Sequence, residues 1–113
     1  MKARTIYVDD VATTTTTYYT VPANNRAKIV FLNLQHDTGS GAKDVEVLVN
    51  DGTNDNHLMH AKGLNIGDNQ NFNVSQTSYV MMEAGYIVKA VATDTGCQMI
   101  MTVEETPFLV STA

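Results

Sequence analysis

The chain is divided by clusters of Gly, Pro, Asn and Asp into short runs rich in β-branched and aromatic residues. The clusters recur at a spacing of roughly 8 to 15 residues, which is typical of sandwiches and barrels. They lie at 22–25, 37–41, 50–55, 67–69, 84–85 and 94–96. A chain of 113 residues has the length of one domain. The spacing therefore predicts an all-β fold, a single antiparallel β-sandwich over 1–113 of jelly-roll or immunoglobulin-like type, with 1–17 and 106–113 as candidate extended arms.

Apolar and polar residues alternate in the clearest strands, which predicts one face in the core and one in water. The segment Lys43–Asn50 has this pattern, and Cys97–Glu104 repeats it. A third strand is expected around Phe72 and Val74. The residues expected to face the core in the first two strands are Val45, Val47, Val49, Cys97, Met99, Met101 and Val103. Leu48 is an exception to the alternation, because it is apolar.

Two further segments are apolar on both faces. Within Arg26–Leu34, Ala27, Ile29 and Phe31 are expected to share one side, opposite Val30, Leu32 and Leu34. Tyr86–Ala92 is similar. Such strands are either central in their sheets or covered on the outside by another subunit. The segment Gln76–Ala84 is predicted as a strand rather than a helix, because Tyr79-Val80 and the nearby Gly85 suit a strand followed by a turn.

The charge of the chain excludes several classes of partner. The formal net charge is −5 with seven Lys and Arg, so no basic stripe is available for nucleic acid or an anionic membrane. No run is long enough to span a membrane, and the first ten residues lack the apolar stretch of a signal peptide, so synthesis in the cytosol is expected. Charged residues make up only 17%, and a surface of neutral Thr and Asn suits packing against other proteins. The lone Cys97 is expected to be a buried small hydrophobe.

One motif suggests catalysis. Asp37-Thr38-Gly39-Ser40 resembles the active-site loop of aspartic proteases, and a second Asp-Thr-Gly occurs at 94–96. These enzymes need two carboxylates that share one proton. Here Gln35 and His36 separate the loop from the apolar strand before it, and no glycine-rich flap follows. Because Asp, Thr and Gly are ordinary hairpin residues, we predict turns, no catalytic residues and no enzyme activity.

Three histidines and one polar loop are candidate metal ligands. His57 and His60 are three residues apart, so on a regular strand they point to opposite faces and cannot reach one ion. His36 is a distant third histidine. The loop 50–56 has several oxygen ligands but lacks the acidic alternation and final Glu of an EF-hand. A hairpin turn is predicted there, with a loose calcium site as the alternative. We therefore expect no metal and no cofactor.

A run of five threonines and the C-terminal tail are the candidate interaction segments. β-branching favours extended conformations, so the threonine run is predicted to be a flat edge strand, or an edge that pairs with a neighbouring subunit. The apolar tail after Pro107 is predicted to be a last strand or a docking arm. The interaction residues predicted from these segments are Thr13, Thr14, Thr15, Thr16, Thr17, Tyr18, Tyr19, Phe108, Leu109 and Val110.

Several segments follow one pattern of strands and turns. In Tyr19–Val30 a Thr-Val-Pro-Ala turn leads to a basic residue and a strand, and Lys43–Asn50 is similar to the next strand of that pattern. Leu64–Asn69 and Met82–Ala90 look like its later elements. In this pattern, which spans 18–103, the chain resembles small β-sandwich structural and decoration proteins of tailed bacteriophage virions. Tyr86 stands where these families commonly have Asp after the Ala-Gly turn.

The resemblance implies a virion protein without catalytic residues or cofactor. We expect a head decoration (cement) protein that is made in the host cytoplasm and stabilises the capsid by bridging neighbouring subunits. The implied partners are the major capsid protein or another virion protein, and copies of the chain itself in a homo-oligomer. The alternatives are a neck or tail ring component, or a carbohydrate- or receptor-binding module. In that module Tyr7, Tyr18, Tyr19, Tyr79 and Tyr86 would stack on sugars, although the chain has no Trp.

Overall fold

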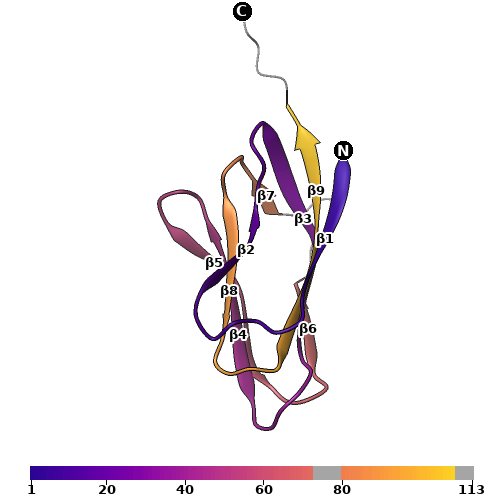
Figure 1. Ribbon diagram of the computed structural model, residues 1–113, viewed down its shortest axis with the longest axis vertical. Coiled ribbons are helices and arrows are strands. Elements are labelled where there is room, and N and C mark those ends of the chain that lie inside the picture. The colour runs from indigo at the N-terminus through magenta and orange to yellow at the C-terminus, as the bar shows by residue number, and fades with distance from the viewer. Residues whose placement is uncertain (73–79, 109–113) are drawn as a thin grey trace, which may run out of the picture.

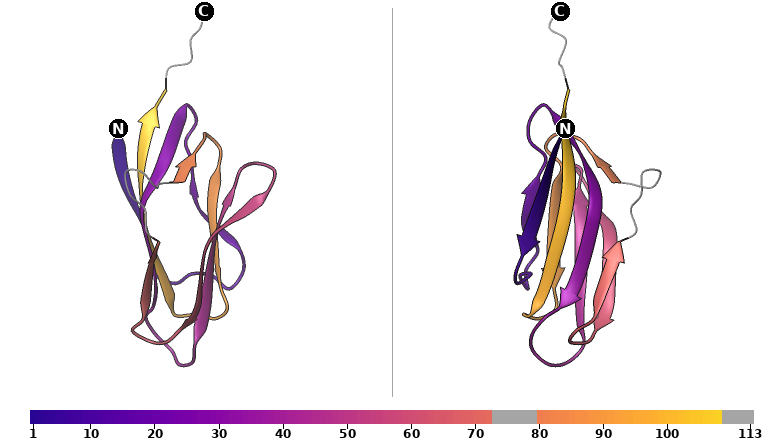
Figure 2. Two further views of the ribbon diagram at one scale, coloured as in Figure 1. Left: turned by 180° about the vertical axis from the view of Figure 1, so that it is seen from behind. Right: turned by 90° about the vertical axis from the view of Figure 1, so that its right-hand side faces the viewer.

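The computed structural model describes residues 1–72 and 80–108, and within these residues the protein consists of two packed antiparallel β-sheets without helices (Figures 1 and 2). The predicted single β-sandwich is confirmed. Sheet A contains β1 (Lys2–Val8), β3 (Asn25–His36), β6 (Asn69–Phe72), β7 (Val80–Met82) and β9 (Cys97–Pro107). Sheet B contains β2 (Thr16–Thr20), β4 (Lys43–Asn50), β5 (Asp55–Leu64) and β8 (Ile87–Ala92).

The order of the strands is that of a jelly roll. Sheet A runs β1-β9-β3-β6, and sheet B runs β2-β8-β4-β5. The short strands β6 and β7 share the place beside β3, because β7 pairs with its first half and β6 with its second half. Among the described residues, β1 lies at one edge of sheet A and β6 and β7 at the other, while β2 and β5 lie at the edges of sheet B. Strand β1 begins and strand β9 ends at the same end of the sandwich, drawn at the top of Figure 1.

The core lies between the sheets and follows the predicted alternation in the clearest strands. Val45, Val47 and Val49 of β4 are buried in this core, and Leu48, the exception in the pattern, is also buried but does not belong to the core cluster. The alternate residues of β9 from Cys97 to Val103 are buried as predicted. The other buried hydrophobic residues of this core include Val11, Tyr19, Val21, Ile29, Leu32, Leu34, Met59, Ala61, Met82, Val88 and Ala90.

A bulge in β3 overturns the predicted grouping of its side chains. The pairing of β3 with β9 shifts between Ile29 and Phe31, so one extra residue is inserted into β3 at this point. Ala27 and Ile29 face the core before the bulge, and Leu32 faces it afterwards. The prediction that Phe31 shares a face with Ile29 is therefore wrong, and Phe31 is 43% exposed. Both β3 and β8 are central strands, and a central position in the sheet is one of the two explanations given above for strands that are apolar on both faces.

Residues 2–8 and 106–108, which belong to the candidate arms, contact the sandwich. The whole of β1 pairs with β9, so residues 2–8 belong to sheet A. Thr106 and Pro107 continue β9, and the backbone N–H of Phe108 donates to the carbonyl of Asn24 at 3.0 Å. Residues 80–82 form a strand, as predicted for 76–84, whereas Val74 and the rest of 73–79 lie outside the described residues. A helix long and apolar enough to cross a membrane is not found in the described part of the chain.

Candidate assembly surface

The threonine run is divided between a connection and an edge strand. Thr13 and Thr14 lie in a bend that leads the chain from sheet A to sheet B, and β2 begins only at Thr16. The prediction of one flat strand through all five threonines is therefore wrong. The connection is held by neighbouring backbone groups, because the N–H of Val11 donates to the Cys97 carbonyl at 2.8 Å. The register of β2 against β8 also shifts between Thr17 and Tyr19, which leaves this edge irregular.

Tyr19, one of the predicted interaction residues, is a buried internal partner. Its hydroxyl donates to the carboxylate of Glu105 at 2.6 Å, and both side chains are buried. Burial and the contact with Glu105 raise the pKa of the Tyr19 hydroxyl above its ordinary value. The Arg4 guanidinium lies 3.3 Å from the same carboxylate and 5.9 Å from the centre of the Tyr19 ring. This network joins β1, β2 and β9, so the contacts of the Tyr19 side chain are made within the domain.

Tyr18 and Phe108 are also attached to the domain. The backbone N–H of Ala12 donates to the Tyr18 hydroxyl at 2.8 Å, and the Tyr18 side chain is half-buried. Phe108 is 37% exposed, with the Arg26 guanidinium 5.5 Å from the centre of its ring. Leu109 and Val110 lie outside the described residues. Phe108 is therefore the part of the predicted C-terminal docking segment that the structure places on the surface.

The two Asp-Thr-Gly sequences meet at the end of the sandwich opposite the chain ends. The carbonyl of Gly96 accepts hydrogen bonds from the N–H groups of Asp37 at 2.8 Å and Thr38 at 3.2 Å. The two carboxylates have separate partners, because Asp37 accepts from Gln98 at 3.2 Å and Asp94 accepts from the N–H of Thr95 at 2.8 Å. The turns predicted from the sequence are present at both positions.

Beneath these turns lie the buried side chains of His36 and Lys43, with the core residue Cys97 opposite His36 in the register. The Lys43 ammonium contacts the carbonyl of Thr95 and lies 3.9 Å from the Asp94 carboxylate. The Nε2 atom of His36 is 3.0 Å from the carbonyl oxygen of Gly41. Burial raises the pKa of the Cys97 thiol, and the charge of Lys43 opposes this shift. Cys97 is thus a buried, protonated core residue, as expected from the sequence.

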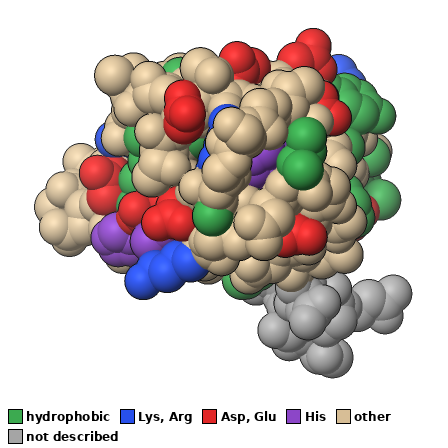
Figure 3. Space-filling view, turned by 90° about the horizontal axis from the view of Figure 1, so that it is seen from below, with side chains coloured by type: hydrophobic (Ala, Val, Ile, Leu, Met, Phe, Trp, Pro, Cys, Tyr) green, Lys and Arg blue, Asp and Glu red, His purple; other side chains and the backbone are tan. Residues whose placement is uncertain are grey.

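His57 and His60 lie on the same face, contrary to the prediction. The register of β5 against β4 shifts near Leu58, and the extra residue turns both histidines to the outer face of sheet B. The His57 imidazole contacts the Glu46 carboxylate, and His60 is opposite Glu46 in the register. Figure 3 shows histidine, acidic and basic side chains side by side on one flank of the molecule. Even so, the described residues contain no group of three or more His, Cys, Asp or Glu that could hold a metal ion.

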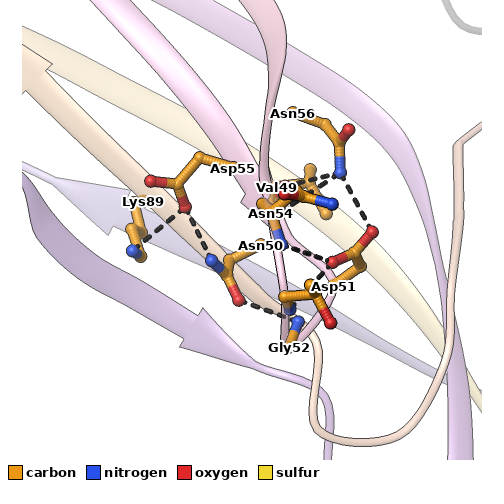
Figure 4. A network of polar contacts seen from close by, with 9 residues as sticks. Val49, Asn50, Asp51, Gly52, Asn54, Asp55, Asn56 and Lys89 are labelled. Atoms are coloured by element: carbon orange, nitrogen blue, oxygen red, sulfur yellow. Dashed lines mark hydrogen bonds and ion pairs between the residues drawn. The ribbon is translucent and has the colours of Figure 1, made fainter.

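The loop after β4 uses its oxygen atoms to close a hairpin (Figure 4). The Asp51 carboxylate accepts from the backbone N–H of Asn54 at 2.8 Å, and this bond is the main reason that the pKa of Asp51 is lowered. The Asp55 carboxylate accepts from the Asn50 amide at 2.7 Å and from the Lys89 ammonium at 3.1 Å. The oxygens of Asn50, Asp51 and Asp55 therefore accept from the protein's own donors, and the segment forms the predicted hairpin turn.

The outer faces of the two sheets differ in charge. Sheet B exposes ionisable side chains along β4, β5 and β8, which are Asp44, Glu46, Asp55, His57, His60, Lys62 and Lys89. On the outer face of sheet A, the ionisable residues Arg26, Lys28 and Glu104 lie toward one end of β3 and β9, where Lys28 is opposite Glu104. The middle of this face carries uncharged side chains, which we call the neutral face. It comprises Thr5, Tyr7, Phe31, Asn33, Gln35, Asn71, Gln98, Ile100 and Thr102.

Pairs of like side chains cross the strands of the neutral face. Thr5 and Thr102 are linked at 3.0 Å, Asn33 donates to Asn71 at 2.6 Å, and Gln35 donates to Gln98 at 2.6 Å. Tyr7 is 70% exposed beside them. Fixed, uncharged donors and acceptors next to exposed aromatic rings cost little to desolvate, so this face is suited to packing against another protein. Of the tyrosines considered for sugar stacking, Tyr19 is buried, Tyr18 and Tyr86 are half-buried and Tyr7 is exposed, while Tyr79 lies outside the described residues.

The sequence matches no protein-family model and no curated protein. The fold is similar to a solved structure described by the words "Bacillus endospore appendages form a novel family of disulfide-linked pili". The TM-score is 0.54 at 15% sequence identity, and the similarity covers 96% of this chain and 88% of the other. At this level of identity the similarity concerns the fold.

Proposed function

We propose that the protein is a non-enzymatic structural protein of a bacteriophage virion, a head decoration protein that stabilises the capsid by bridging neighbouring subunits. The observation that carries the proposal is the neutral face. The chain has a net charge of −5, yet the middle of this one sheet face presents hydrogen-bonding and aromatic side chains without an ionised group. Such a face can be covered by capsid subunits without burying unpaired charges.

The mechanism requires only modest affinity at each contact. A decoration protein that binds the assembled shell but not its separated subunits stabilises the shell by mass action. When many copies bind a symmetric lattice, small interfaces act together. The charged outer face of sheet B would remain in solvent on the opposite side.

The similarity to an endospore appendage protein is compatible with a role in assembly, since that protein forms pili. Its disulfide linkage has no counterpart here, because the single cysteine, Cys97, is buried in the core. Support for the phage virion comes from the resemblance of the strand and turn segments across 18–103.

Co-sedimentation with undecorated capsids of the encoding phage tests the proposal, with isolated tails as a second probe. Asn71 is an exposed residue of the neutral face, and Asn71→Lys is expected to weaken binding to capsids at least tenfold by placing an unpaired charge in the contact. His60→Lys adds the same side chain to the outer face of sheet B and should bind like the wild type. Binding to tails alone would refute the head location, and binding to neither particle would refute the virion role.

A further inference from the structure

The edge strands of the two sheets differ in how well they could accept another strand. The pairing of β2 has one register shift and that of β5 has two, while β6 is only four residues long. By contrast, β1 pairs with β9 through seven consecutive residues, Lys2–Val8, without a shift. Its sequence contains neither Gly nor Pro. A regular edge strand without a bulge is a template for β-pairing, so β1 is the best formed of these edges.

Internal contacts hold β1 in place while leaving its outer edge free. On the inner side, Arg4 binds the buried Glu105 and lies over the Tyr19 ring, and Ile6 packs against the core. Removing β1 would leave the Glu105 carboxylate buried without its cationic partner, which is costly. A partner strand is therefore expected to be added beside β1 rather than exchanged for it.

We propose that β1 pairs in antiparallel fashion with β1 of a second copy of this chain, about a twofold axis at Thr5. The two A sheets then form one continuous sheet, and their neutral faces lie side by side on the same surface. This inference is independent of the virion role, because it rests on the edge of sheet A and on no other protein.

The sequence of β1 selects this register. In an antiparallel pair, residues directly opposite each other point to the same face of the sheet. A twofold axis between two identical strands must therefore lie where one residue is opposite the same residue of the other copy. An axis at Arg4 would set two arginines opposite each other, which is destabilising. An axis at Thr5 uses all seven residues, with Lys2 opposite Val8, Ala3 opposite Tyr7 and Arg4 opposite Ile6.

Two features of the free protein are satisfied by this register. The Tyr7 ring, 70% exposed in the monomer, would pack across the partner's small Ala3, and symmetry makes this contact twice. Lys2 would lie near Asp9 and Asp10, which follow Val8 of the other copy and are exposed in the monomer. Opposite charges therefore meet at both ends of the paired strands, within a chain whose net charge of −5 otherwise opposes self-association.

Substitutions at Thr5 test the pairing, with solution mass measured by light scattering and sedimentation. Wild-type protein is expected to have the mass of a dimer. Thr5→Lys should shift it to the monomer mass, raising the dissociation constant at least tenfold, because two ammonium groups would face each other at the axis. Thr5→Ala is the matched control, since it removes the same Thr5–Thr102 hydrogen bond without adding charge, and it should remain a dimer.

A cross-linking experiment reports on the register itself. Thr5→Cys should form a disulfide-linked dimer under mild oxidation, whereas Thr20→Cys, an exposed threonine on the irregular edge strand β2, should not. A monomeric wild type, a Thr5→Lys variant that stays oligomeric, or equal cross-linking of the two cysteine variants would each overturn the pairing. A monomer that still co-sediments with capsids would overturn the pairing and leave the proposed virion function standing.

Discussion

The bond between Tyr19 and Glu105 gives the most direct test of how this sandwich is stabilised. Tyr19→Phe removes only the hydroxyl that donates to the Glu105 carboxylate at 2.6 Å, and both residues are only 5% exposed. A hydrogen bond to a charged group contributes about 1.5–3 kcal/mol, and a buried acceptor that loses its donor is costly to leave unpaired. The Arg4 guanidinium remains 3.3 Å from Glu105, so a value near the middle of that range is expected.

We therefore expect Tyr19→Phe to lower the free energy of unfolding by about 2 kcal/mol, with a fall in Tm of roughly 8 °C for a domain of this size. Urea unfolding followed by circular dichroism, together with a thermal scan, measures both quantities. Tyr7→Phe is the control, because the Tyr7 side chain is 70% exposed, and it should change stability by less than about 0.5 kcal/mol.

A double variant separates the hydrogen bond from packing. Tyr19→Phe combined with Glu105→Leu should lower the free energy of unfolding by less than the sum of the two single changes, because no buried carboxylate then remains. If Tyr19→Phe is as mild as Tyr7→Phe, or if the two changes are simply additive, the reasoning that Glu105 depends on Tyr19 is refuted.

Three further predictions concern turns and the core. Gly96→Ala should destabilise the protein far more than Gly52→Ala in urea unfolding. Both glycines have positive φ, of 102° and 94°, but an added Cβ at Gly96 would lie 2.2 Å from the carbonyl oxygen of Thr38, whereas Gly52 has open space. Equal losses would contradict this. Cys97 should react with a thiol reagent only upon unfolding, because it is fully buried and its thiol pKa is raised; fast reaction of the native protein would contradict its burial. In the folded protein the pKa of Asp51 lies below its ordinary value of 3.8. The ionised carboxylate therefore stabilises the hairpin above pH 3.8, and this contribution is lost as the pH falls through the lower pKa of the folded state. A titration of the carboxyl group by NMR, with the Asn54 amide as a second probe, should show this lowered midpoint, and Asp51→Asn should abolish it.

Strands with strict alternation could be predicted from the sequence alone. Lys43–Asn50 was predicted with the bounds of β4, and the buried positions of Cys97–Val103 follow the same rule. Strand β4 pairs with β8, and β9 pairs with β1, without a register shift, so the period of two persists along both strands. The extra residues in their other pairings belong to β5 and β3.

The errors arose where a strand gains one residue relative to its neighbour. In β3 the bulge near Val30 separates Phe31 from Ile29, and in β5 the shift near Leu58 brings His57 and His60 to one face. A bulge depends on the pairing with another strand, so the local sequence gives little indication of it. The threonine run failed for a related reason, because the need to cross between the sheets outweighed the extended preference of Thr13 and Thr14.

The neutral face was anticipated only in general terms, from the low content of charged residues. Its members come from four strands, β1, β3, β6 and β9, that are distant in the sequence. Tyr7 and Phe31 belong to it, although neither was among the predicted interaction residues. Alternation within each strand identifies its outward side chains, but their union into one surface depends on the order of the strands.

A contact surface without ionised groups also determines how binding depends on the surrounding solution. Few ordered counterions need to leave such a surface when it is covered, so its affinity should change little between dilute buffer and molar sodium chloride. Excluded salts such as sulfate should strengthen the contact. Long-range steering is likewise weak, which places the association rate constant near the unassisted range of about 10⁵–10⁶ M⁻¹s⁻¹. A protein that docks through Tyr7, Phe31 and the amide pairs of sheet A would therefore fill its sites slowly, and occupancy would depend on its concentration far more than on ionic strength.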